Sequence, residues 1–224
     1  MNQERRSEKR SIATFKSAYI EHNDRLRYVT LRDISTSGVC FSGLDNTLTE
    51  GDDIKFTIDD TGPRHGSVIW VKDDKFGVKS HEGNEFEAPR MVFRRPRSVR
   101  LPLSGEAKVF AGSQSLRTLL HNLSLRGTCV TNERNLRPGQ LVSLEVGGNC
   151  FELATVKWVV EDRAGICFAQ PLQALQFNHL LDRLQSANGI EAVNPQLEPG
   201  LTEVQQELFP TSNCPVNRHS MASA

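Results

Sequence analysis

Short runs with a hydrophobic residue at every second position dominate the sequence. Clear examples are Ile54, Phe56 and Ile58; Val142, Leu144 and Val146; and Ala154, Val156, Trp158 and Val160. A period of two predicts strands with one buried face. Asn-Asp, Thr-Ser-Gly, Thr-Glu-Gly and Asp-Asp turn signals separate these runs. About six short strands per 90 residues favour a small antiparallel barrel, whose closure removes exposed sheet edges.

Helical spacing is sparse. Hydrophobic residues at spacings of three and four predict one amphipathic helix over residues 171–186, ended by Asn188-Gly189; they are Leu172, Leu175, Phe177, Leu180, Leu181 and Leu184. The chain beyond is rich in Pro, Ser and Asn. We predict that it is mostly disordered, with a short helical stretch near Thr202–Leu208.

An internal repeat sets the domain count. DISTSG at 33–38 resembles NLSLRG at 122–127 (122 − 33 = 89), and the segments at 67–80 and 155–168 resemble each other (155 − 67 = 88). This period is too long for a solenoid, so it indicates tandem domains. We predict domain 1 at residues 1–88, domain 2 at 89–187 and a tail at 188–224. The expected fold class is mainly β, with two tandem six-stranded antiparallel barrels, a C-terminal helix and a disordered tail.

Composition narrows the function classes. Lys plus Arg and Asp plus Glu are both 27 in 224 residues, and this zero net charge argues against a bulk nucleic-acid binder, so no DNA partner is expected. The sequence contains neither a long apolar run nor the apolar core of a signal peptide, so we expect a cytoplasmic location and no membrane span. The five cysteines have no C-x-x-C spacing, which makes a disulfide framework or a zinc site improbable.

Positive charge gathers in two arginine clusters, which are either solvated loops or anion sites. The first contains R-x-x-x-R at Arg6 and Arg10, with Arg5 adjacent. D-x-S-x-x-G follows at Asp33, Ser35 and Gly38, a pattern also typical of an ordinary turn before a strand. Each motif alone is a weak signal. The two motifs become specific when they occur in this order and are followed by G-V-C-F, V-x-W-V and F-G-V.

This combination resembles the PilZ domain, a bacterial receptor module for cyclic di-GMP, over about residues 5–82 and 93–170. The resemblance implies six-stranded barrels, usually with a C-terminal helix. It also implies that Arg5, Arg6, Arg10, Asp33, Ser35 and Gly38 bind the ligand in domain 1. The corresponding residues of domain 2 are Arg97, Arg100, Asn122, Ser124 and Gly127. That second arginine motif is damaged, because Pro96 stands four residues before Arg100.

The chemistry of these residues fits such a ligand. A guanidinium can clamp phosphate oxygens, pair with guanine O6 and N7, or stack on a base. Asp33 can accept from guanine N1 and N2 or fix the turn, and Ser35 offers a hydroxyl beside a phosphate. Gly38 allows a positive φ or a close approach to the ligand.

We therefore expect a non-enzymatic cyclic di-GMP receptor, with its primary site in domain 1, that changes conformation and signals to a protein partner. Ligand is expected to order residues 4–11 against the barrel. No catalytic motif is found, and no catalytic residue, metal or further cofactor is expected. The alternatives are a protein–protein interaction adaptor with degenerate nucleotide sites and, less favoured, a single-stranded nucleic-acid binder, which would expose aromatic residues. Trp70 and Trp158 are instead expected in the core, and Cys40, Cys129 and Cys167 as small buried residues.

Overall fold

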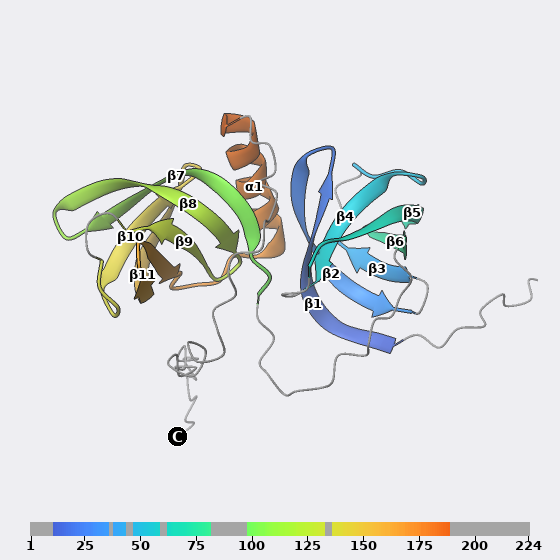
Figure 1. The fold of residues 1–224 in the computed structure, drawn as a ribbon, viewed down its shortest axis with the longest axis horizontal. Helices are drawn as coiled ribbons and strands as arrows, with labels where there is room; N and C mark the ends of the chain where they lie inside the picture. The colour runs from blue at the N-terminus through green and yellow to red at the C-terminus, as the bar shows by residue number, and fades with distance from the viewer. Residues whose placement is uncertain are drawn as a thin grey trace, which may run out of the picture. The chain divides into compact units, whose positions relative to one another are not determined.

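Six strands form a first closed antiparallel barrel, hereafter barrel 1 (Figure 1). The computed structural model describes residues 11–35, 38–43, 47–58, 62–81, 98–132 and 136–188. All of these lie in one compact unit. The strand order is β1-β2-β3-β6-β5-β4, formed by β1 (Ser11–His22), β2 (Arg25–Ile34), β3 (Gly38–Ser42), β4 (Asp53–Ile58), β5 (Arg64–Lys72) and β6 (Lys75–Ser80).

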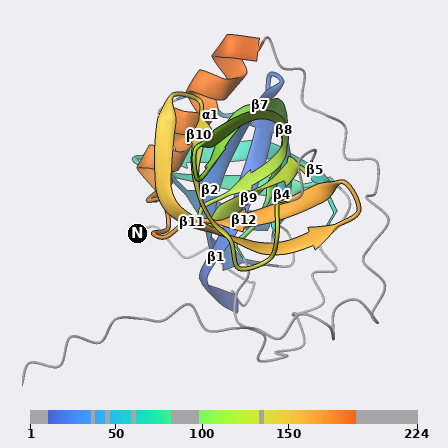
Figure 2. The same ribbon diagram turned by 90° about the vertical axis from the view of Figure 1, so that its left-hand side faces the viewer.

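A second closed barrel, barrel 2, repeats this connectivity as β7-β8-β9-β12-β11-β10 (Figure 2). Its strands are β7 (Leu101–Ala111), β8 (Gln114–Ser124), β9 (Gly127–Thr131), β10 (Leu141–Val146), β11 (Asn149–Val160) and β12 (Arg163–Cys167), and one helix follows, α1 (Ala174–Asn188). The predicted fold class is confirmed. The domain boundaries and the disordered tail stay predictions, because residues 82–97 and 189–224 lie outside the described residues.

The alternating positions that predicted the strands form the barrel cores. Ile54, Phe56 and Ile58 are buried in barrel 1, where Phe41 packs against Phe56 and Phe76. The matching residues of β10 are equally buried in barrel 2. Burying one apolar face of each strand supplies the main driving force for closing the sheet.

The expectation that both tryptophans lie in the core is wrong. Register shifts after Val68 in β5 and after Val156 in β11 turn the following residues around. Trp70 and Trp158 are therefore half-buried, and each indole lies against a glycine, Gly77 in barrel 1 and Gly165 in barrel 2. Phe76 and Val78 point into the core, so Gly77 between them faces outward and the tryptophan covers the outer surface.

Helix α1 begins three residues later than predicted. Gln176 accepts a hydrogen bond from the backbone N–H of Gln173 (3.1 Å), which caps a helix starting at Ala174. The residues just before it are held by the β8–β9 turn instead: the N–H groups of Phe168 and Leu172 donate to the carbonyls of Arg126 (2.9 Å) and Leu125 (2.7 Å).

The buried face of α1 packs against both the barrel 2 core and the β1–β2 hairpin of barrel 1. Four of its side chains pack into the barrel 2 core: Phe177, Leu180, Leu181 and Leu184. The same hydrophobic cluster includes three residues of the β1–β2 hairpin of barrel 1, namely Tyr19, Leu26 and Tyr28. Packing of the hairpin against α1 explains why β2 is buried on both faces over residues 26–29, Arg27 included.

Two amide side chains of α1 also bond the backbone edge of β2. Strand β3 pairs with β2 only from Thr30 onward, so the edge before it has no strand partner among the described residues. Gln185 Oε1 accepts from the Leu26 N–H (2.6 Å), and Gln185 Nε2 donates to the Leu26 carbonyl (3.1 Å). Asn178 makes the same pair of bonds with Tyr28, at 2.9 and 3.0 Å. We call this contact the α1–β2 clasp.

Candidate functional site

The second predicted motif of domain 1 forms the turn between β2 and β3. The Ser35 N–H donates to the Gly38 carbonyl (2.8 Å). Ser35 Oγ donates to the same carbonyl and accepts from the Gly38 N–H, both at 3.1 Å. Asp33 pairs with Cys40 across the two strands. The structure therefore brings Asp33, Ser35 and Gly38 together at one end of barrel 1.

The first strand of barrel 1 begins beside this turn. Ser11, the first residue of β1, pairs with Ile34, which directly precedes Ser35. The predicted ligand residues Arg5, Arg6 and Arg10 lie outside the described residues, as does the predicted ordering of residues 4–11. Ser11, which directly follows Arg10 in the sequence, lies next to the serine turn.

One of the two reasons given above for Gly38, a positive φ, is wrong. The backbone of Gly38 does not adopt a positive φ. A Cβ atom there would instead collide with the backbone carbonyl oxygen of Val78 in β6. Gly127 of barrel 2 has the same relation to the carbonyl of Ile166. Glycine is therefore required at both positions because the neighbouring strand, β6 or β12, lies too close for a side chain.

Barrel 2 contains the corresponding turn in a more closed form. Ser124 is only 7% exposed; its Oγ donates to the Gly127 carbonyl (3.0 Å) and accepts from the Arg126 N–H (3.3 Å). The Asn122 carbonyl accepts from Thr128 Oγ1 (2.7 Å). Carbonyls of this turn also accept hydrogen bonds from the segment that leads to α1, as described above, so the turn has a structural role in barrel 2.

The arginine side of domain 2 is only partly described. Arg100 is exposed and directly precedes Leu101, which pairs with Leu123. This reproduces the relation of Ser11 to Ile34 in barrel 1. Arg97 lies outside the described residues.

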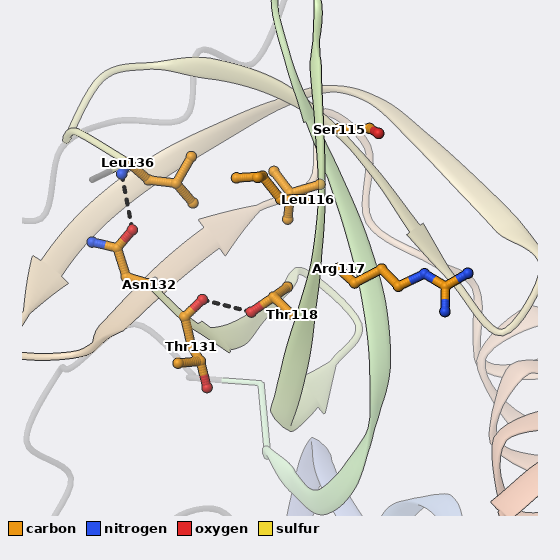
Figure 3. A pocket seen from close by; sticks show the side chains of 8 residues that line it. Ser115, Leu116, Arg117, Thr118, Thr131, Asn132 and Leu136 are labelled. Atoms are coloured by element: carbon orange, nitrogen blue, oxygen red, sulfur yellow. Dashed lines mark hydrogen bonds between the residues drawn. The ribbon is translucent and has the colours of Figure 1, made fainter. Parts of the chain in front are cut away.

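Two hollows in the described part of the chain lie away from these turns. A cavity of about 80 Å³ at the end of barrel 2 is lined by Thr118, Thr131, Asn132 and Leu136, among others (Figure 3). Its polar groups are already paired, since Thr118 Oγ1 donates to the Thr131 carbonyl and Asn132 Oδ1 accepts from the Leu136 N–H. The side chain of Arg117 extends away from the other labelled residues (Figure 3). This cavity is too small and too well satisfied for a dinucleotide.

An open groove of about 460 Å³ lies on barrel 1, lined by three histidines and three carboxylates: Glu21, His22, Asp24, Asp53, His65 and His81, with Asn23, Ile54 and Lys55. Lys55 Nζ is bonded to Glu21 Oε1 at 2.8 Å, and this ion pair raises the pKa of Lys55 above its usual value. The remaining carboxylates repel a polyanionic ligand.

Other chemistry has little support in the described part of the chain. It contains no group of three or more His, Cys, Asp or Glu residues arranged to hold a metal ion. Its four cysteines are free thiols; Cys129 is buried as predicted, whereas Cys40 and Cys167 are only half-buried. No helix within it has the length and apolar character needed to cross a membrane.

The PilZ domain model matches this chain twice, at residues 4–88 and 94–186. The two matches cover most of the sequence, and each contains one barrel with its serine turn. The chain therefore belongs to the PilZ domain family, with two PilZ domains in tandem.

Several solved structures are similar to this chain. The Bacillus subtilis inhibitor of motility, MotI/DgrA, is 14% identical, covers 79% of this chain and 97% of its own, and has a TM-score of 0.34. Borreliella burgdorferi PlzA in complex with c-di-GMP is 10% identical over 76% of this chain and 87% of its own, with a TM-score of 0.33. Escherichia coli YcgR in complex with c-di-GMP is 14% identical over 77% and 81%, with a TM-score of 0.29. No curated protein sequence matches.

Proposed function

We propose that this protein is a non-enzymatic cyclic di-GMP receptor, with its primary site in domain 1 and Arg5, Arg6, Arg10, Asp33, Ser35 and Gly38 as the ligand-binding residues. The observation that carries the proposal is the start of β1 at Ser11, opposite Ile34. The arginine motif ends at Arg10 and the serine turn begins just after Asp33. Two motifs that are 23 residues apart in sequence (33 − 10) are therefore proposed to meet at one end of barrel 1.

The expected affinity follows from the number of charged contacts. A hydrogen bond to a charged group contributes about 1.5–3 kcal/mol net. Three or four of them, less the cost of ordering the arginine segment, are enough for micromolar affinity, about −8 kcal/mol. Arginine is suited to this task because one planar, permanently charged group serves both phosphate and guanine.

Domain 2 is proposed as the weaker site, with Arg97, Arg100, Asn122, Ser124 and Gly127 as its candidate residues. The buried hydroxyl of Ser124 already has two partners, and the same turn anchors the segment before α1. A ligand there would have to compete with these contacts, whereas Ser35 is half-buried. Exposed Arg100 retains the position expected for the second arginine of the motif.

Signalling is proposed to pass along β2. This strand contains Asp33 at one end and takes part in the α1–β2 clasp at Leu26 and Tyr28. Arg27, buried between these two residues, pairs with Asp182 of α1 at 2.8 Å. A ligand that binds one arrangement of β2 more tightly would favour the matching arrangement of α1 by the same free energy. A protein partner that binds only one arrangement of α1 would then respond to the ligand.

Titration calorimetry of the full chain with cyclic di-GMP tests the proposal. We expect Arg10→Ala to weaken the main binding event at least about tenfold, corresponding to the loss of one charged contact. Arg100→Ala is the matched control and is expected to change that event less than about twofold. Hydrogen exchange of residues 1–12 should slow on saturation. Unchanged affinity of Arg10→Ala would remove the domain 1 site.

One observation favours the adaptor alternative for domain 2. Leu141 and Leu153, on neighbouring strands β10 and β11, are 61% and 68% exposed. The residues 88 positions earlier in domain 1 are polar, Asp53 and His65. Exposed leucines of this kind suit contact with a protein partner better than contact with a nucleotide. Loss of partner capture by Leu153→Ser, with cyclic di-GMP affinity unchanged, would support this role for domain 2.

A further inference from the structure

The outer face of barrel 1 extends the serine turn across two further strands. Val39 and Phe41 of β3 point into the core, so Gly38 and Cys40 face outward. Asp33 pairs with Cys40 and therefore shares that outer face. The turn residues thus border a surface that continues from β3 onto β6.

Lys79 lies directly beside the turn on this surface. Its Cα pairs with that of Gly38, and Val78, the preceding residue, is fully buried. Lys79 consequently faces outward and is exposed. Paired residues of an antiparallel sheet are only about 5 Å apart at Cα, and glycine has no side chain to obstruct the lysine stem. The ammonium group can therefore reach the space above the turn.

The charge of Lys79 is not used within the described residues, where it has neither an ion pair nor a side-chain hydrogen bond. Another exposed lysine of the barrel, Lys55, is paired with Glu21 at 2.8 Å. The described N–H groups of the turn, those of Ser35 and Gly38, are already bonded within it, so an exposed ammonium next to it supplies a donor that an anion held there would need. The sequence patterns did not single out this residue.

The equivalent position of barrel 2 contains no charge. Gly127 pairs with Cys167, just as Gly38 pairs with Lys79. The offset is 167 − 79 = 88, the same as that of the repeat. Cys167 is half-buried, and its thiol lies 3.5 Å from the Phe168 carbonyl. The two domains therefore differ next to the motif glycine as well as in the arginine segment.

We propose that Lys79 is an additional ligand-binding residue of domain 1, whose ammonium donates to a phosphate oxygen of the cyclic dinucleotide held at the Asp33–Gly38 turn. The proposal rests on the proposed function of domain 1. It gives a second reason, independent of Pro96, for a stronger site in domain 1 than in domain 2.

The test is calorimetric titration of the full chain with cyclic di-GMP at two salt concentrations. Lys79→Gln removes the charge and is expected to raise Kd about tenfold at low salt, with a shallower salt dependence than wild type. Lys79→Arg should stay within about threefold of wild type, because it retains the charge. Lys75→Gln is the matched control: Lys75 is exposed on the same strand but pairs with Ser42, at the far end from the turn. It should change Kd less than about twofold.

The possible outcomes separate the two proposals. If wild type binds and Lys79→Gln binds equally well, the role of Lys79 is wrong and the receptor function stands. Equal weakening by Lys79→Gln and Lys75→Gln also overturns it, because only the overall charge would then matter. If wild type binds no cyclic di-GMP, the receptor function fails and the inference fails with it.

Discussion

Replacing Gln185 by alanine should open the α1–β2 clasp. Gln185 is 9% exposed and makes three hydrogen bonds, two with the backbone of Leu26 and one with the Leu181 carbonyl (3.1 Å). Leu26 is 2% exposed, so Gln185→Ala leaves the N–H and the carbonyl of Leu26 buried without hydrogen-bond partners. Each unpaired buried group costs about 1–3 kcal/mol. Because α1 can move away and admit water, we expect a loss of about 2–4 kcal/mol.

Urea unfolding and hydrogen exchange measure this loss. The Leu26 amide should exchange about 30-fold faster or more in Gln185→Ala, since each 1.4 kcal/mol corresponds to a factor of ten. Gln176→Ala is the control, because Gln176 is exposed on the same helix and contacts only the Gln173 N–H (3.1 Å). It should cost about 0.5–1 kcal/mol and leave Leu26 protected. If the Leu26 amide exchanges at the wild-type rate in Gln185→Ala, the clasp does not contribute to stability.

Three further predictions concern single side chains. Burial raises the pKa of Tyr19 above its ordinary 10.0, so the folded state favours the neutral phenol. The contribution of Tyr19 to stability should be fully present below pH 10.0 and be lost above it, and Tyr19→Phe should remove that part of the loss in thermal unfolding. Ser124→Ala should destabilise the protein by about 1 kcal/mol in urea unfolding, more than Ser35→Ala, because Ser124 is buried; the reverse order would contradict the assignment of a structural turn to domain 2. Gly77→Ala should cost about 1–3 kcal/mol, because the new Cβ would meet the indole of Trp70; an unchanged melting temperature would show that the indole moves freely.

The repeat made the architecture predictable. Residues that alternate with period two, such as Ile54 and Phe56, are buried as expected, and both barrels have the same connectivity. The positions of the tryptophans were not predictable from alternation, because one extra residue in β5 or β11 reverses the face of everything that follows it. Sequence alone does not reveal where such a bulge falls.

The candidate site was predictable only where it is local in sequence. Asp33, Ser35 and Gly38 form one turn, so their spacing was enough to find them. Lys79 is 41 residues further along the chain (79 − 38) and reaches the turn only through the pairing of β3 with β6. Comparison of the two repeats supplies the missing signal, since Lys79 aligns with Cys167 at the common offset. The α1–β2 clasp leaves no clear trace in the sequence, because Arg27 interrupts the apolar residues of β2 and its partner Asp182 is 155 residues away.

The clasp also sets an order of events during synthesis on the ribosome. Leu26 and Gln185 are 159 residues apart. At about 5–20 residues per second, translation separates their appearance by about 8–30 s. Throughout that interval the nascent edge of β2 has no α1 to cover it, and an uncovered edge readily recruits a foreign strand. Chaperone occupancy of the emerging first domain should therefore persist until α1 leaves the exit tunnel.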